Sequence, residues 1–224
     1  GSREEKIKNL YENVINWEAR DAAGIEPIRP WLEAIDQAGS LAELMELHCE
    51  ISREAAVSIL MGFGLTTDLE DSTKNRVTFA TLYPSLGTRA SYDDAATAAA
   101  YRQYLETLLT LGGRTAEQAS AEAAAYIEME KGLADPMMSR QDYGDADQIY
   151  NLYTMEELEA LFPQVDLQAV LDATGFALDG EVLVEDPGLL EASAAYFDDS
   201  HLELLKTTMR LGVLSGFGGV LSRA

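Results

Sequence analysis

Apolar residues recur along most of the chain at the three-to-four-residue spacing that places them on one face of a helix. Between residues 4 and 22 these positions are Ile7, Leu10, Tyr11, Val14, Ile15 and Trp17. Gly24 predicts the end of this first helix. A second, short helix is expected after Pro27 and Pro30. Its apolar side carries Trp31, Leu32 and Ile35.

Capping patterns predict where four further helices begin. In a capping box, a Ser or Thr side chain accepts a hydrogen bond from the amide three residues later, and a Glu or Gln there accepts one from the capping residue's amide. The pairs that fit are Ser40 with Glu43, Thr115 with Gln118, Thr154 with Glu157, and Ser200 with Glu203. The helix after Ser40 has an apolar side of Leu41, Leu44, Met45 and Leu47.

The other helix boundaries are predicted from glycine, proline and a further cap. Pro163 ends the helix that begins at Thr154, where Tyr153 and Leu158 are placed to form an apolar staple. Asp186 followed by Pro187 is typical of a helix start. The helical segments expected from breaks at glycine pairs or single glycines are 91–111, 115–133 and 166–174.

The β content is expected to be small. Two apolar runs, around 63–66 and 76–82, flank a polar loop and predict a hairpin, and a brief strand is expected at 181–184. The predicted fold class is therefore mainly α, a multi-helix domain with a small β-hairpin. Gly1 and Ser2 have the look of a cloning scar, so residues 3–224 are expected to form a single helical domain cut from a longer chain.

Composition narrows the classes of partner. The 224 residues include 39 acidic and 16 basic side chains, which give a formal charge of −23. Nucleic acid and anionic membrane surfaces are disfavoured as partners, because both require clustered cations. No apolar run is long enough to cross a membrane. Cys49 is the only cysteine, so no internal disulfide is expected, which slightly favours a cytoplasmic location and otherwise leaves localisation unknown.

Few residues are candidates for catalysis or metal binding. His48 and His201 are the only histidines, and no H-E-x-x-H motif is present. In "HCE" (48–50), a surface or core histidine beside a buried cysteine is the preferred interpretation. The loop "DLEDSTKN" (68–75) and the segment "DYGDAD" (142–147) fail the calcium-loop pattern, so a solvated turn is expected for the loop. The sequence therefore assigns no catalytic and no metal-binding residue.

Five segments occur in an order that is more informative than any one of them. They are "NLYENVINWEARDAAGIEPIRPWLEAID" (9–36), "GFGLTTDLEDSTKNRVTF" (62–79), "YIEMEKGLA" (126–134), "YNLYTMEELEALFP" (150–163) and "LELLKTTMRLGVLSGFGGVLSRA" (202–224). Together they resemble the N-terminal domain of neprilysin-like zinc metallopeptidases, the endothelin-converting-enzyme type, in their bacterial oligopeptidase form. The departures are "SLGTRASYD" (85–93), where relatives carry a Gly-Leu-Gly-Leu-Pro loop and then Arg-Asp-Tyr-Tyr, and the glycines at 216, 218 and 219.

The resemblance implies a helical domain that faces a thermolysin-like catalytic domain and encloses with it a cavity that admits peptides and excludes folded proteins. The zinc and its ligands would belong to that catalytic domain, so this chain is expected to bind no cofactor and to be inactive alone. Its partners would be the parent's own catalytic domain and peptide substrates, and the substrate-binding residues stay unknown. The alternative is a stand-alone helical interaction module that binds a partner through an apolar groove.

Overall fold

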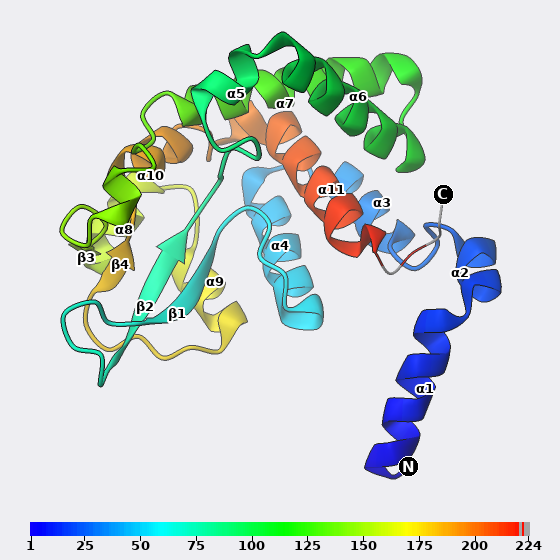
Figure 1. Cartoon of the computed structure of the whole chain (residues 1–224), viewed down its shortest axis with the longest axis horizontal. Helices are drawn as coiled ribbons and strands as arrows, with labels where there is room; N and C mark the ends of the chain where they lie inside the picture. The colour runs from blue at the N-terminus through cyan, green and yellow to red at the C-terminus, as the bar shows by residue number, and fades with distance from the viewer. Residues whose placement is uncertain (220, 222–224) are drawn as a thin grey trace.

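The structure is a computed structural model that describes residues 1–219 and 221. Its helices are α1 (Arg3–Ile15), α2 (Trp17–Ala23), α3 (Arg29–Gln37), α4 (Leu41–Ala55), α5 (Arg89–Asp93), α6 (Ala95–Leu111), α7 (Ala116–Ala134), α8 (Met155–Leu161), α9 (Leu167–Thr174), α10 (Pro187–Ala194) and α11 (Leu202–Gly218). Its strands are β1 (Gly62–Thr67), β2 (Asn75–Ala80), β3 (Asn151–Tyr153) and β4 (Val182–Val184). The predicted class, mainly α with a small β element, is confirmed (Figure 1).

The β element is larger than the predicted hairpin. β1 and β2 pair antiparallel, with Phe63 opposite Phe79, which confirms the hairpin. β4, which the sequence predicts, pairs parallel to β2, and β3 pairs antiparallel to β4, so the sheet order is β1-β2-β4-β3. β3 escapes prediction because its three residues are all half-buried and do not alternate between apolar and polar types.

α11 is the central helix of the body (Figure 1). It contacts α3, α4, α6 and α7, which come from distant parts of the sequence. Its buried residues are Leu205, Lys206, Thr207, Thr208, Met209, Arg210, Leu211, Val213 and Leu214. On the other side of the body, α9 lies against α4 and β1. One apolar core therefore runs from α11 through α4 to the sheet.

Two predicted helices are each broken by a polar residue that caps a new helix. The segment predicted over 4–22 divides at Asn16, whose side chain accepts a hydrogen bond of 3.1 Å from the Ala19 amide at the start of α2. The segment predicted over 91–111 divides at Asp94, whose carboxylate accepts one of 2.8 Å from the Thr97 amide at the start of α6. Such short side chains compete with the helical backbone for its hydrogen bonds, so periodicity alone does not locate these breaks.

The four predicted capping boxes have three different outcomes. Those at Thr115 and Thr154 form completely. Ser40 caps α4, but the Glu43 carboxylate accepts from the Gly39 amide at 2.7 Å in place of the Ser40 amide. The box at Ser200 is wrong, because Asp198 caps a 3₁₀ turn there and accepts from the Ser200 amide.

α11 consequently begins one residue later than the sequence predicts. It starts at Leu202, and its N-cap His201 makes no capping hydrogen bond through its side chain. Glu203, predicted to complete the box, instead forms an ion pair with Lys206 at 3.0 Å.

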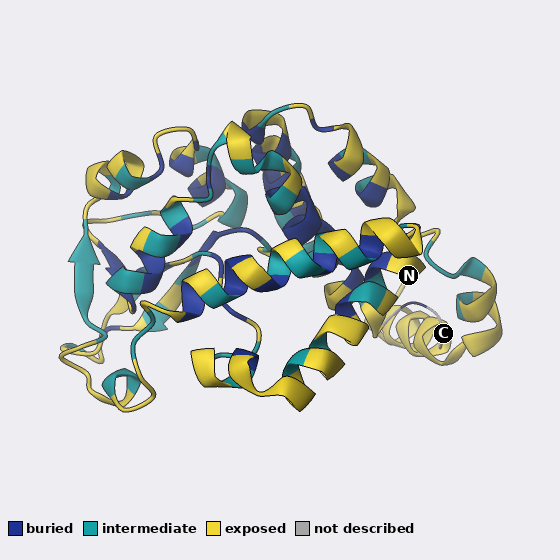
Figure 2. Ribbon diagram, turned by 90° about the horizontal axis from the view of Figure 1, so that it is seen from above, coloured by how far each residue is buried: buried dark blue, intermediate teal, exposed yellow. Residues whose placement is uncertain are grey.

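The first two helices form an arm that leaves the body (Figure 1). None of the residues of α1 and α2 is buried. In Figure 2 this part of the chain is almost wholly in the colour of exposed residues, whereas the body shows buried stripes on most of its helices. The helical periodicity predicted over residues 4–22 is present in α1, where the apolar side chains are exposed.

Candidate functional site

A groove with a volume of about 960 Å³ lies between α3, α4 and the start of α9. Its wall is formed mainly by one side of α4. The residues that line it are Ala34, Gln37, Ala38, Ala42, Glu43, Met45, Glu46, Leu47, Cys49, Glu50, Arg53, Gln164, Asp166 and Ala169. A large concave surface is the usual place for a ligand, so we treat this groove as the candidate site.

The groove combines an apolar floor with an acidic edge. Ala38, Met45 and Cys49 are buried and form part of the floor. The exposed edge carries several acids and a single cation: Glu43, Glu46, Glu50, Asp166 and Arg53. The glutamates lie three and four residues apart along α4, the spacing that places side chains on one face of a helix. Chemically, such a surface suits an extended segment with apolar and basic side chains.

The neighbouring "HCE" residues are parts of the core. His48 is 1% exposed, and its Nε2 donates a hydrogen bond of 2.8 Å to the Met61 carbonyl oxygen. Burial lowers the pKa of His48 to about 4 against the opposing effect of that hydrogen bond, so the imidazole is neutral at neutral pH. Burial also raises the pKa of the Cys49 thiol. This confirms the interpretation of a core histidine beside a buried cysteine.

The acidic loop uses its first carboxylate to hold the hairpin turn together. Asp68 is buried and accepts hydrogen bonds from the Glu70 and Asp71 amides, at 2.9 and 3.1 Å. It also accepts from Arg76 Nε at 2.6 Å and from the Tyr150 hydroxyl. The Arg76 guanidinium and these donors hold the pKa of Asp68 well below its usual range. Both oxygens of Asp68 therefore act within the fold.

The second acidic segment, 142–147, is likewise occupied by local bonds. Asp142 accepts from the Ser139 amide at 2.9 Å, and Asp145 accepts from the Asp147 amide at 3.1 Å. Over residues 1–219 and 221, no group of three His, Cys, Asp or Glu side chains is arranged to hold a metal ion. Within the same residues, no helix combines the length and the apolar character needed to cross a membrane.

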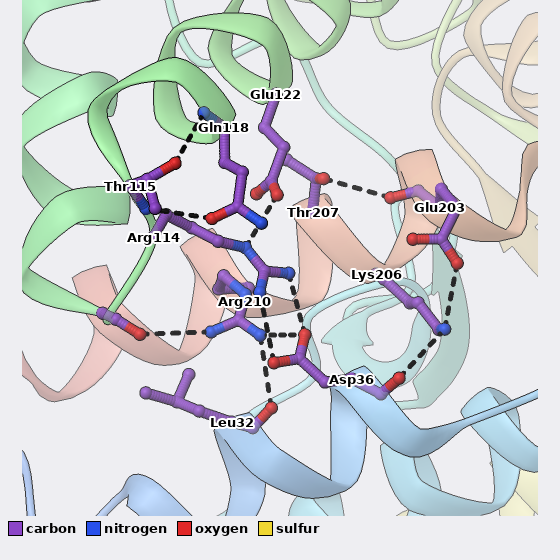
Figure 3. Close-up of polar contacts among 11 residues, drawn as sticks. Leu32, Asp36, Arg114, Thr115, Gln118, Glu122, Glu203, Lys206, Thr207 and Arg210 are labelled. Atoms are coloured by element: carbon purple, nitrogen blue, oxygen red, sulfur yellow. Dashed lines mark hydrogen bonds and ion pairs between the residues drawn. The ribbon is translucent and has the colours of Figure 1, made fainter.

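An ionic cluster joins α3 to α11 and to the α6–α7 loop (Figure 3), and it runs from the buried Arg210 to Asp36, whose side chain is 41% exposed. The Arg210 side chain is 1% exposed, and its guanidinium donates to the Asp36 carboxylate and to the Leu32 and Gly112 carbonyl oxygens. Arg114 pairs with the same Asp36 at 2.8 Å and with Glu122 at 2.7 Å. The cluster thus fixes α3, which forms one wall of the groove, against the central helix.

The ionisation of Asp36 follows from this arrangement. Burial alone would raise the pKa of Asp36, but the hydrogen bonds from Arg114 and Arg210 outweigh it and hold the pKa below its ordinary value. Sequence reasoning misses this cluster, since its members are far apart in the chain. The one available signal is Arg210 within the otherwise apolar run of α11.

The loop that departs from the family pattern is packed by its own polar contacts. Glu130, fully buried, accepts hydrogen bonds from the Ser85 amide and hydroxyl, at 2.8 and 2.5 Å, and from the Tyr101 hydroxyl at 2.8 Å. The buried Tyr92 accepts one from the Leu86 amide at 3.2 Å. Leu86 and Tyr92 therefore have a structural role in this loop despite its altered sequence.

The fold of this chain occurs within longer proteins of known structure. Zinc metalloprotease Zmp1 of Mycobacterium tuberculosis, in complex with an inhibitor, superposes with a TM-score of 0.86 and 27% identity over 99% of this chain and 35% of that one. PepO of Lactobacillus rhamnosis HN001 shares the fold, with a TM-score of 0.79 and 17% identity over 96% of this chain and 35% of that one. Neprilysin-2 of Drosophila melanogaster is 24% identical over 160 residues, 70% of this chain and 20% of the relative.

The family model described as Peptidase family M13 matches residues 1–224. The chain belongs to peptidase family M13, and it corresponds to the N-terminal domain of these peptidases. It spans about a third of the length of the solved relatives and a fifth of the curated one. The resemblance inferred from the order of sequence motifs is therefore confirmed, and the chain contains only part of what those relatives contain.

Proposed function

We propose that this chain is the non-catalytic N-terminal domain of a zinc metalloendopeptidase and that it walls the cavity in which oligopeptides are cut. The observation that carries the proposal is the match of 99% of this chain to 35% of a zinc metalloprotease. The zinc site would belong to the other part of the parent, because this sequence has only two histidines and no H-E-x-x-H. No catalytic step is assigned to a residue of this chain.

The groove supports a role in substrate handling. Its volume of about 960 Å³ and its apolar floor suit an extended peptide, and its acidic edge favours basic side chains. A wall of this kind restricts substrates by shape, because a folded protein cannot enter a space that an extended chain fills. The parent would thereby act on oligopeptides and spare folded proteins.

The test compares the 224-residue chain with the parent polypeptide. We expect the parent to cleave a free oligopeptide in the presence of zinc, to spare the same peptide sequence when it is embedded in a folded protein, and the 224-residue chain to cleave neither. Cleavage by the isolated chain with stoichiometric zinc would show that it holds a catalytic site. Equal cleavage of the free and embedded sequences by the parent would show that the cavity does not select by size.

The hypothesis of a stand-alone interaction module makes a different prediction about the native gene. On that hypothesis the native reading frame stops near residue 224, whereas the peptidase proposal predicts that it continues to an H-E-x-x-H motif. Sequencing the native gene beyond this point therefore separates the two functions without any biochemical assay.

A further inference from the structure

α1 presents an unusual amount of apolar surface. The α1 stripe consists of six side chains on α1 and at the start of α2, with their exposed fractions in brackets: Ile7 (59%), Leu10 (65%), Tyr11 (64%), Val14 (49%), Ile15 (49%) and Trp17 (40%). These are more than half of the exposed large apolar residues described in the whole chain. A contiguous patch of this kind marks a surface that another polypeptide covers.

The helix beneath the α1 stripe is formed by local signals alone. Ser2 caps it by accepting a hydrogen bond of 3.2 Å from the Glu5 amide, and Glu4 and Glu5 lie in its first turn, where negative charge is favourable. Lys8 and Glu12 form an exposed ion pair at 3.6 Å. A helix of 13 residues is marginal in water unless its apolar face is packed. The arm therefore lacks the packing that ordinarily stabilises such a helix.

One arginine ties the base of the arm to the end of α11. Arg20 Nε and Nη2 donate to the Leu221 and Gly219 carbonyl oxygens, both at 2.8 Å, and Nη1 donates to the Val14 carbonyl oxygen at 2.8 Å. Its guanidinium also lies 3.9 Å from the centre of the Trp17 ring. Gly219 and Leu221, which follow α11, are thereby held against the base of the α1 stripe.

We propose that the α1 stripe is the docking surface for the part of the parent polypeptide that follows residue 224. The inference rests on the proposed function, in that it takes this chain as one domain of a longer peptidase. The solved relatives are about three times as long as this chain, which leaves ample polypeptide to cover the surface.

The distances suit this occupant. α1 is roughly 20 Å long at 1.5 Å per residue, and an extended chain covers that length in about six residues. A segment that starts beside Arg20 can therefore reach every side chain of the α1 stripe directly. A face of large apolar side chains on a helix is matched by a second helix or strand with its own apolar face. The docked partner is accordingly expected to present apolar residues to α1.

Cysteine labelling tests the inference. Leu10→Cys is placed in the 224-residue chain and in the parent, and its rate of reaction with a maleimide is measured in both. The native Cys49 gives little background, because it is 4% exposed and burial raises the pKa of its thiol. We expect labelling at position 10 to be slower in the parent by about ten-fold or more, since thiol reactivity follows exposure.

Asn9→Cys is the matched control, because Asn9 is exposed on the side of α1 opposite the α1 stripe. It should label equally fast in the parent and in the 224-residue chain, which also shows that α1 is otherwise intact. Equal labelling of position 10 in the two proteins would overturn the inference. Protection of position 10 that grows with the concentration of the 224-residue chain would also overturn it, in favour of a second copy as the occupant.

The readout separates this inference from the proposed function. Labelling depends on coverage of α1 and not on catalysis, while zinc-dependent cleavage by the parent tests the function. Protection in a parent that cleaves no peptide would leave the docking surface in place and remove the function. Cleavage without protection of position 10 would leave the proposed function in place and remove the docking surface.

Discussion

α1 and α11 share a helical pattern of apolar residues, yet their surroundings are opposite. In α1, Leu10 is 65% exposed and no residue is buried. In α11, even the charged Arg210 is 1% exposed. One helix places apolar side chains in water, and the other places a cation in the core.

The difference shows that burial is decided by the neighbours of a helix as much as by its own sequence. α11 lies among α3, α6 and α7, and its Arg210 finds carbonyl and carboxylate acceptors on α3 and at the end of α6. A buried cation is tolerated only where such partners surround it. α1 has the apolar residues of a packed helix, but no neighbouring element covers them. This is what we expect of a surface that binds another part of the parent polypeptide.

Arg210→Ala should have the largest effect on stability. The substitution removes a buried cation together with its bonds to Asp36 and to the Leu32 and Gly112 carbonyl oxygens, so the buried Leu32 carbonyl loses this donor. We expect the free energy of unfolding to fall by about 4 kcal/mol, because truncating this fully buried side chain leaves a cavity in the core and an unpaired buried carbonyl. Urea denaturation of the 224-residue chain measures this directly.

Arg102→Ala is the matched control for a solvent-exposed arginine. Arg102 pairs with Glu106 at 2.9 Å one turn later on α6, and its side chain is 48% exposed. The loss should be about 0.5 kcal/mol, since exposed ion pairs contribute little. Similar losses for the two arginines would mean that the Arg210 cluster is not a buried network in solution.

His48 should make the body of the molecule sensitive to acid. In the unfolded chain a histidine has a pKa near 6.5, whereas the pKa of His48 in the fold is about 4. Because the unfolded state takes up the proton first, the stability contributed by neutral His48 is complete above pH 6.5 and declines as the pH falls toward 4. The loss amounts to about 3 kcal/mol, at 1.36 kcal/mol for each pKa unit. Unfolding curves at several pH values measure it.

His48→Gln provides the control for this pH dependence. A glutamine amide can donate to the Met61 carbonyl oxygen as Nε2 does, but it gains no charge in acid. The variant should therefore show a flatter stability profile between pH 6.5 and 4. Asp36 contributes acid sensitivity at lower pH in both proteins, because its lowered pKa leaves its stabilising charge intact until the pH falls through that pKa. Parallel profiles for the two proteins would contradict the burial of His48.

The elements best predicted from sequence are those specified by neighbouring residues. The boxes at Thr115 and Thr154 depend on contacts three residues apart, and the hairpin at 62–80 depends on pairing within one short stretch of chain; all are as predicted. The order of motifs likewise identified the family, since it does not depend on three-dimensional detail. Local rules therefore account for most of the helices.

What sequence reasoning missed depends on contacts between distant segments. β3 exists because β4, some thirty residues later, offers it a pairing edge. The Asp36 cluster needs α3, the α6–α7 loop and α11 to meet, and the groove needs α9 to lie beside α4. No pattern within a short stretch of sequence specifies contacts between segments that lie far apart in the chain. The Ser200 box failed for the opposite reason, because the nearby Asp198 carboxylate accepts from the Ser200 amide that Glu203 would have used.

Removing a helix cap should distinguish a helix of the body from the arm. Thr154 Oγ1 accepts from the Glu157 amide at 3.2 Å and caps α8, which buries Leu158 completely. Thr154→Ala should therefore lower the free energy of unfolding by about 1 kcal/mol. Ser2 caps α1 in the same way, but Ser2→Ala should reduce only the helicity of the arm. A loss below a few tenths of a kcal/mol for Thr154→Ala would contradict its capping role.

Leu10→Ala in the arm should have the smallest effect. In the 224-residue chain Leu10 is 65% exposed, so the free energy of unfolding should change by less than about 0.5 kcal/mol. Leu205, fully buried in α11, is the matched position in the body, and Leu205→Ala should cost about 2 to 5 kcal/mol. Comparable losses at the two positions would mean that α1 packs on the body in solution. If the α1 stripe is covered in the parent, Leu10→Ala should lower the free energy of unfolding of the parent only. Truncation of a covered side chain leaves a cavity, whereas truncation of an exposed one does not.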